Sequence, residues 1–500
     1  MAATLTEVLG AGLAASPALV SPDGPSYTYG ELREQVAAFA AALRRLGIGR
    51  QDRVASIFPN GPEAVIAFLA VAEVATSAPL NPAYKEDEFR FYLDDTEARA
   101  VLLPPGAYPA ARAALPEGIR LIEVEIDRGG RVHLDGRPAE VGEATVGNRR
   151  PAPDDVALIL HTSGTTSRPK MVPIRHRNLA ASVANIVATY ELGPEDVTLC
   201  VMPLFHIHGI VASCLSTFGS GGTVVVPSKF NPMSFWPLVK EHRATWYSAV
   251  PTIHQMLLMR SGTSRPEGAG TLRFIRSSSS ALPPEVMRRL EERFGAPVLE
   301  AYGMTEASHQ MASNPLPSRG EHRAGSVGLG TGVEIGIMDE AGALLPAGAT
   351  GEIVIRGPNV VDGYANNPEA SAAAFSEGWF RTGDQGFLDP AGYLTLTGRL
   401  KEMINRGGEK IAPREIDDVL LEHPAVAEAV AFGVPHEAWG EEVAAAVVIR
   451  APVTEKELLA HCRERLADFK VPRVLHIVEA IPRTATGKIQ RRSVAAAFTA

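Results

Sequence analysis

The chain has 500 residues, of which 45% are hydrophobic and 21% are charged, and its formal net charge is −9. This length exceeds what one ordinary hydrophobic core fills, so we expect a globular protein of about two to four domains or subdomains. The negative charge argues against nucleic acid as a partner, because phosphate backbones recruit basic surfaces. The sequence contains neither an apolar span long enough for membrane insertion nor the pattern of a secretory signal, so we expect a cytoplasmic protein.

The cysteines indicate the redox state of the chain. Cys200, Cys214 and Cys462 are few, scattered and odd in number. This pattern favours reduced thiols in the core over a disulfide framework, and the absence of a Cys-x-x-Cys pair argues against a metal site built on thiolates.

The first predicted element is a helix over 29–46. Leu32, Val36 and Phe39 recur there at helical spacing, and Gly47 ends the pattern. Residues 118–150 are polar and punctuated by proline and glycine, so we expect a surface excursion there. The other elements expected before residue 118 are strands over 54–58 and 100–103 and helices over 63–74 and 86–93.

The alternation of strands and helices continues through the middle of the chain. It favours mainly parallel sheets covered by helices on both faces, in a large N-terminal domain over 1–399. Short glycine-rich strands then predict a small β-rich subdomain over about 326–399. The elements expected here are strands over 156–160, 199–202, 224–226, 245–250, 272–277, 333–338, 351–356 and 393–397 and helices over 178–190 and 284–294.

The last hundred residues have the composition of a separate unit. Alternating patterns over 425–434, 442–449 and 455–467 read as βαβ-like, so we expect a small mobile α/β domain over 400–500. Lys401 lies at its start and is the expected hinge. The fold class is therefore α/β, and the oligomeric state stays open between monomer and homodimer.

A polar segment directly follows the predicted strand 156–160. Its sequence is HTSGTTSRPK, over residues 161–170. Glycine lets the backbone approach a phosphate chain, hydroxyls and main-chain N–H groups donate hydrogen bonds, and the basic side chains neutralise charge. A flexible linker is the alternative, and the nucleotide-binding pattern Gly-x-x-x-x-Gly-Lys is absent. The candidate phosphate-binding residues are Thr162, Ser163, Gly164, Thr165, Thr166, Arg168 and Lys170.

Four further motifs follow this loop in order. They are EAYGMTE at 300–306, GWFRTGD at 378–384, GRLKE at 398–402 and PRTATGK at 482–488. With the loop, they make nearly the whole chain resemble the adenylate-forming acyl-CoA synthetase superfamily. The resemblance implies that a carboxylate attacks the α-phosphate of ATP to give an acyl-adenylate and pyrophosphate. A thiol, that of CoA, then attacks the acyl carbonyl and AMP departs, with Mg²⁺ required alongside ATP and CoA.

The resemblance also implies roles for individual residues. Thr305 would bind the α-phosphate, Glu306 would hold Mg²⁺, and Lys488 would bridge the attacking carboxylate and the α-phosphate. Rotation about Lys401 would bring Arg406, Gly407 and Gly408 to the CoA thiol. The residues implied at the adenine and ribose, with Tyr302 stacking on the base and Asp384 accepting from the ribose hydroxyls, are Ser279, Ser280, Ala281, Glu300, Ala301, Tyr302, Gly303, Asp384 and Arg399.

The residues around the predicted acid pocket are polar. His206, His208 and His309, with the serines of 277–280, suit a small acid that carries a second charged group. The segments PLFHIHG at 203–209, RSSSS at 276–280 and EASH at 306–309 are similar to the oxalyl-CoA synthetase group. This similarity implies oxalate as the acid, with its distal carboxylate on His208, Ser279 and His309, and with His206 near the reacting end as a candidate catalytic residue.

Other substrates and roles stay open at this point. Malonate is the nearest competitor, although malonyl-CoA synthetases typically carry an arginine where this chain has Ala301. A short-chain or aryl acid, or a carrier-protein thiol as acceptor, would fit the same reaction class. A catalytically silent scaffold and a luciferase-like oxidase are further alternatives, and some of the histidines could be structural. Met171 stands where the superfamily commonly has glycine, which affects the expected backbone path after Lys170.

Overall fold

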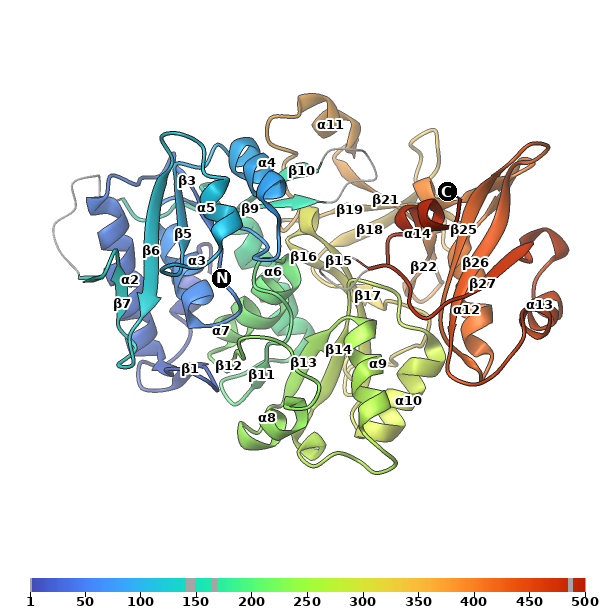
Figure 1. The fold of residues 1–500 in the computed structure, drawn as a ribbon, viewed down its shortest axis with the longest axis horizontal. Coiled ribbons are helices and arrows are strands. Elements are labelled where there is room, and N and C mark those ends of the chain that lie inside the picture. Colours follow the sequence, from blue (N-terminus) through green and yellow to red (C-terminus); the bar gives the residue numbers. More distant parts are fainter. Residues whose placement is uncertain (1, 141–148, 163–168, 484–488, 500) are drawn as a thin grey trace.

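The computed structural model describes residues 2–140, 149–162, 169–483 and 489–499 (Figure 1). Its first sheet has eight strands in the order β10-β9-β4-β3-β5-β6-β7-β8. The pairs between β9 and β6 are parallel, and the pairs at both edges are antiparallel. The strands are β3 Arg53–Ser56, β4 Thr76–Pro79, β5 Ala100–Leu103, β6 Arg120–Ile126, β7 Val132–Leu134, β8 Arg137–Pro138, β9 Val156–Thr162 and β10 Lys170–Arg175.

The expectation of a surface excursion over 118–150 is wrong for its first half. Residues 120–138 form β6, β7 and β8, which extend the sheet at one edge. Val124, Val132 and Leu134 are buried while their neighbours are more exposed, so a half-buried antiparallel edge explains the high polar content.

The second sheet has nine strands in the order β17-β16-β15-β14-β13-β11-β12-β1-β2. Its pairs from β15 to β1 are parallel, whereas β16, β17 and β2 add antiparallel edges. The strands are β1 Pro17–Val20, β2 Tyr27–Thr28, β11 Val197–Leu199, β12 Thr223–Val225, β13 Trp246–Ala249, β14 Phe274–Ser277, β15 Val298–Met304, β16 His309–Ser313 and β17 Leu329–Gly330.

Helices cover these two sheets and join them through one apolar core. Phe68 and Ile186 pack in the core that also contains Leu158 of β9 and Val224 of β12. A second core lies between the nine-stranded sheet and α8, α9 and α10. The helices of this region are α1 Leu5–Leu9, α2 Tyr29–Arg45, α3 Pro62–Val74, α4 Glu86–Thr96, α5 Pro109–Ala113, α6 His176–Tyr190, the π-helix η1 His208–Leu215, α7 Ser216–Ser220, α8 Phe235–Glu241, α9 Pro251–Arg260, the 3₁₀-helix η2 Ala269–Thr271 and α10 Pro284–Phe294.

A third, antiparallel sheet follows the second. Ile353, Phe380 and Leu394 form its core together with Ala312 of β16, so this sheet packs against the edge of the nine-stranded one. Its elements are β18 Glu334–Met338, β19 Gly351–Arg356, α11 Pro368–Ala373, β20 Phe375–Ser376, β21 Trp379–Leu388 and β22 Leu394–Arg399.

The last sheet lies in the orange and red part of Figure 1, at the opposite end of the molecule from the blue strands of the first sheet. The βαβ-like prediction is wrong for residues 425–449, because β25 and β26 pair as an antiparallel hairpin. In the described part of this sheet, only β26, α13 and β27 form a parallel crossover. The elements are β23 Ile404–Arg406, β24 Glu409–Ile411, α12 Pro413–Glu422, β25 Val426–His436, β26 Gly440–Ile449, α13 Glu455–Arg463, the 3₁₀-helix η5 Asp468–Lys470, β27 Val474–Ile477 and α14 Arg491–Thr499.

The architecture agrees with the predicted α/β class of helix-covered, mainly parallel sheets. All three cysteines are free and buried, as expected for core thiols, and the Sγ atoms of Cys200 and Cys214 lie 3.8 Å apart. Among the helices of the described ranges, none has both the length and the apolar character needed to cross a membrane.

Candidate active site

The predicted phosphate loop connects two strands of the first sheet. His161 and Thr162 belong to β9, and Thr162 lies opposite Lys170, the first residue of β10. The loop is therefore shorter than the sequence suggested. His161 also contacts Asp95 of α4, with 3.0 Å between His161 Nε2 and Asp95 Oδ2. The predicted phosphate ligands Ser163, Gly164, Thr165, Thr166 and Arg168 lie outside the described residues.

Lys170 reaches towards a buried carboxylate. Its Nζ atom lies 4.4 Å from the ring centroid of Tyr364, and the Tyr364 hydroxyl donates to Glu306 Oε1 at 3.0 Å. Glu306 belongs to the 3₁₀-helix η3 Thr305–Ala307, directly after β15. The two ends of this cluster therefore come from different sheets, and Tyr364 connects them.

Opposing effects act on the pKa of Glu306. Burial raises the pKa of Glu306, while the Tyr364 hydrogen bond and the charges of Arg399 and Lys170 oppose the rise. Within the described residues, no three acidic, histidine or cysteine side chains form a metal cage. One buried carboxylate near Lys170 fits Mg²⁺, which protein sites often hold by one or two carboxylates and the phosphates of the substrate. Thr305 is half-buried beside Glu306.

A second cluster brings Tyr302, Asp384 and Arg399 together. The Tyr302 hydroxyl donates to Asp384 Oδ2 at 2.5 Å, and Arg399 Nε lies 2.9 Å from Asp384 Oδ1. Burial and the adjacent Asp384 carboxylate raise the pKa of Tyr302, so its hydroxyl stays protonated and remains a donor. Each Asp384 oxygen keeps acceptor capacity for a ribose hydroxyl. Tyr302 is 8% exposed, and the stacking of its ring on adenine stays a prediction.

The predicted adenine residues flank the carboxyl ends of β14 and β15. Ser280 and Ala281 are exposed, whereas Ala301 and Glu300 are buried. Glu300 Oε1 accepts from the Leu282 N–H at 3.0 Å, and burial raises the pKa of Glu300 to about 7. A neutral carboxyl group is therefore substantially populated there at neutral pH.

Gly303 is required for the close approach of β15 and β16. A Cβ atom at this position would lie 1.9 Å from the carbonyl oxygen of His309. Any larger residue would therefore move β16, which begins with His309.

The three predicted acid-binding residues lie together. His208 Nδ1 lies 3.0 Å from Ser279 Oγ, and the rings of His208 and His309 contact edge to face with centroids 5.1 Å apart. Ser279 has φ +74° and His309 has φ +101°, conformations that are rare for residues with a side chain. Such backbone strain is concentrated at functional sites, which supports the choice of these residues.

His206 takes part in a turn that begins the π-helix η1. Its Nδ1 atom accepts from the backbone N–H of His208 at 3.2 Å, and its side chain is half-buried. Gly209 allows the turn to close, since a Cβ atom there would lie 2.3 Å from the carbonyl oxygen of Pro203. The contact orients the backbone at His208, while a catalytic role of His206 stays a prediction.

Sequence reasoning assigned no role to three further residues of the site. Ser248 contacts His208, and Arg276 contacts both Ser248 and His309. Tyr364 lies between Lys170 and Glu306. A signal for Arg276 was present, because an arginine directly follows two apolar residues within a central strand. No local pattern singles out Tyr364, which approaches the site from a loop far along the chain.

The C-terminal residues of the predicted site are only partly described. Lys488 lies outside the described residues. Lys401 is exposed in the 3₁₀-helix η4 Leu400–Glu402, between the third and last sheets. Arg406 pairs with Glu442 at 2.6 Å, and Gly407 and Gly408 follow with φ of +59° and +95°. Arg406 is therefore held by its own sheet in this structure.

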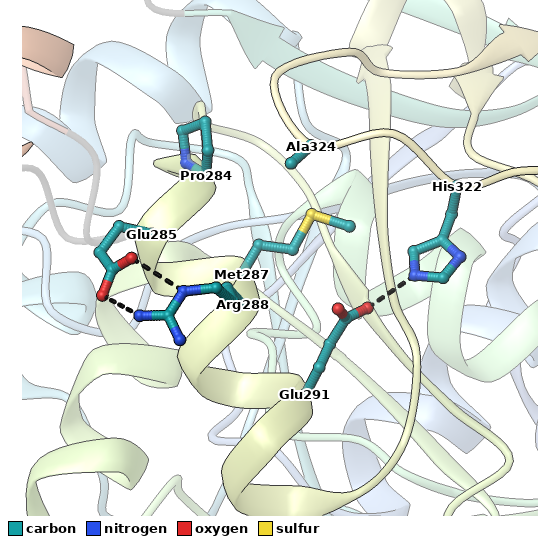
Figure 2. Close-up of a pocket in the computed structure, with 7 residues that line it drawn as sticks. All are labelled: Pro284, Glu285, Met287, Arg288, Glu291, His322 and Ala324. Atoms are coloured by element: carbon teal, nitrogen blue, oxygen red, sulfur yellow. Dashed lines mark hydrogen bonds and ion pairs between the residues drawn. The ribbon is translucent and has the colours of Figure 1, made fainter.

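A separate hollow of about 380 Å³ lies over α10 (Figure 2). Glu291 and His322 point towards each other across it, with 2.8 Å between Glu291 Oε1 and His322 Nε2. The residues that line it include none of the predicted site residues, so this hollow is separate from the candidate active site at the strand ends.

Sheets that present the carboxyl ends of parallel strands to a polar, phosphate-binding crevice are typical of nucleotide-dependent enzymes. Comparison with known sequences specifies the class. Residues 11–365 match the family described as AMP-binding enzyme, and residues 415–488 match the AMP-binding enzyme C-terminal domain. The chain therefore belongs to the AMP-binding enzyme family, which confirms the resemblance to adenylate-forming enzymes.

Individual relatives cover nearly the whole chain. An oxalate–CoA ligase of Arabidopsis thaliana is 49% identical and covers 94% of this chain and 93% of its own. An oxalate–CoA ligase of Saccharomyces cerevisiae is 46% identical over 90% of this chain and 87% of its own. Among solved structures, ATP-bound MatB from Rhodopseudomonas palustris superposes with a TM-score of 0.88 and 32% identity, over 100% of this chain and 99% of that one.

Proposed function

We propose that this chain is an AMP-forming oxalate–CoA ligase. The observation that carries the proposal is the acid pocket, in which His208, Ser279 and His309 present polar groups at a family-typical nucleotide site. A pocket of this kind leaves its polar groups unpaired when a fatty or aryl acid enters, so it disfavours such acids. Relatives named oxalate–CoA ligase, at 49% and 46% identity, support the same substrate.

In the first half-reaction, one oxalate oxygen attacks the α-phosphorus of ATP, and the bond to the bridging oxygen of pyrophosphate breaks. His208, Ser279 and His309 hold the distal carboxylate, so that the reacting carboxylate points to the phosphate. Asp384 and Arg399 fix the ribose, while Lys170 and the loop before it orient the departing pyrophosphate. Bound Mg²⁺, held by Glu306, supplies neutralisation of phosphate charge. Lys488 stabilises the two approaching anions, and Thr305 donates to the α-phosphate.

In the second half-reaction, the CoA sulfur attacks the oxalyl carbonyl, and the bond to the AMP oxygen breaks. The thiol loses its proton to solvent or to a base, and AMP leaves as an anion. We propose that residues 400–500 turn about Lys401 between the two steps and bring Arg406, Gly407 and Gly408 to the thiol. Free CoA is the acceptor, and the reaction takes place in the cytoplasm, where core thiols stay reduced.

Pyrophosphate release tests the substrate. The acids compared are oxalate, malonate, acetate, hexanoate and coumarate, each with and without CoA. We expect oxalate to give the highest kcat/KM and a CoA thioester with equimolar AMP. A preference for hexanoate or coumarate would refute oxalate while leaving the reaction class intact, and release of light or CO₂ without thioester would refute the class.

A variant of Lys488 tests separately whether this residue acts in the first half-reaction. Lys488→Ala should abolish pyrophosphate exchange with ATP but spare thioester formation from preformed oxalyl-adenylate. Exchange that persists in this variant would contradict the role given to Lys488.

A further inference from the structure

Arg276 is a fully buried cation in the middle of β14. Arg276 is 0% exposed, and the two residues that precede it on the strand, Phe274 and Ile275, are apolar. Buried charges are ordinarily paired with an opposite charge, because desolvation of a lone ion is costly. Among the described residues, however, no carboxylate lies within ion-pair distance of this guanidinium.

The groups around the Arg276 guanidinium are neutral hydrogen-bond acceptors. Nε donates to the Tyr190 hydroxyl at 2.9 Å, and Nη1 donates to Ser248 Oγ at 3.0 Å. Nη2 donates to Gln310 Oε1 at 3.0 Å and lies 3.4 Å from His309 Nδ1. The guanidinium is thus solvated by dipoles, and its unit charge is not cancelled by any described side chain.

These hydrogen bonds determine which atoms donate and which accept in the predicted acid pocket. A guanidinium only donates, so Ser248 Oγ accepts from Arg276 and can direct its own hydrogen to His208 Nε2, 2.6 Å away. His208 Nδ1 then carries a hydrogen and donates to Ser279 Oγ at 3.0 Å. In the same way, His309 accepts at Nδ1 and carries its hydrogen on Nε2. Arg276 therefore makes both histidines donors on the side away from itself.

Donor polarity and uncancelled positive charge together suit an anion. A monocarboxylic acid has only one carboxylate, which must face the α-phosphate, so its other end brings no charge to this pocket. We propose that Arg276 is a specificity-determining positioning residue, which acts through Ser248, His208 and His309 to select an acid with a second carboxylate next to the reacting one. This inference rests on the proposed function and deepens it.

The test compares oxalate with oxamate, in which a neutral amide replaces one carboxylate with little change of shape. Pyrophosphate release gives kcat and KM for both acids in wild type and in Arg276→Gln. We expect kcat/KM for oxalate to fall about 10- to 100-fold, mainly through KM, since hydrogen bonds to charged groups are the stronger ones. The value for oxamate should change by less than about threefold, so the oxalate-to-oxamate ratio collapses.

Three further variants separate this role from a structural one. Arg276→Lys keeps the charge and should restore part of the ratio, and Ser248→Ala cuts the path to His208 while leaving the arginine in place. Arg273→Gln is the matched control, because Arg273 directly precedes β14 but pairs with Asp196, at 2.7 Å. This control should lower thermal stability at most, with the ratio unchanged. If Arg276→Gln fails to fold, the oxalate-to-oxamate ratio of kcat/KM in Ser248→Ala decides whether Arg276 acts through Ser248.

The outcomes are distinguishable. If wild type prefers acetate or another monoanion, the proposed function falls. If wild type prefers oxalate but both acids lose the same factor in Arg276→Gln and in Ser248→Ala, the role of Arg276 is refuted and the proposed function stands.

Discussion

Glu300 gives a prediction whose size follows from its burial. The side chain is fully enclosed within β15, among the residues predicted to bind adenine, and burial raises the pKa of Glu300 to about 7 from its ordinary 4.5. In the unfolded chain the carboxyl group therefore ionises first as pH rises. The unfolded state then binds fewer protons than the folded state, so stability falls between these two pH values and levels off above them. At about 1.36 kcal/mol for each pH unit, the fall amounts to about 3 kcal/mol.

The variant Glu300→Gln removes this titration and keeps an acceptor for the Leu282 N–H. We expect the free energy of unfolding of the variant to gain about 3 kcal/mol on wild type between pH 4.5 and pH 8.5, with most of the gain below pH 7. Urea unfolding of both proteins, followed by the fluorescence of buried tryptophans such as Trp246, measures the difference. Other titrating groups are shared and cancel. A difference that stays constant with pH would refute the reasoning.

Three other variants test separate contacts. Tyr364→Phe removes the hydrogen bond to Glu306 but keeps the ring beside Lys170, so we expect a higher Mg²⁺ requirement in pyrophosphate release; an unchanged Mg²⁺ dependence would contradict this. Asp384→Asn should raise the KM for ATP roughly 10- to 100-fold with little change for the acid, and equal effects on both substrates would argue against a ribose contact. Burial lowers the pKa of His176 to about 4 from 6.5, so stability is lost as pH falls through this window; His176→Gln should flatten that acid limb in thermal unfolding scans, and parallel curves would exclude it.

The sequence predicted the core elements well where periodicity and burial agree. The helix over 284–294 and the strand over 100–103 have the predicted bounds, because apolar spacing and flanking turn residues coincide there. The edge strands β6 to β8 were missed, since an edge exposed on one side has as many polar residues as a loop. The hairpin of β25 and β26 was read as βαβ-like because strand propensity does not specify which strands pair.

The residues of the candidate site also differ in whether the sequence alone predicts them. His208, Ser279 and His309 could be proposed as one pocket because family-like motifs surround each of them, and the structure brings them together. Arg276, Ser248 and Tyr364 depend on contacts between distant parts of the chain, such as Tyr190 with Arg276. No residue-level pattern encodes such contacts, so only the folded arrangement reveals them.

The π-helix η1 has a consequence for how the acid pocket can change in evolution. A π-helix has i→i+5 hydrogen bonds, is rare, and occurs mostly as a short bulge within an α-helical stretch, as η1 does directly before α7. Loss of one residue between Gly209 and Leu215 would let the segment relax to an α-helix and turn its beginning by about 100° about the helix axis. His208 would then leave Ser279. A deletion of a single codon would therefore break the contact between His208 and Ser279 while nearly every other residue of the chain stays the same.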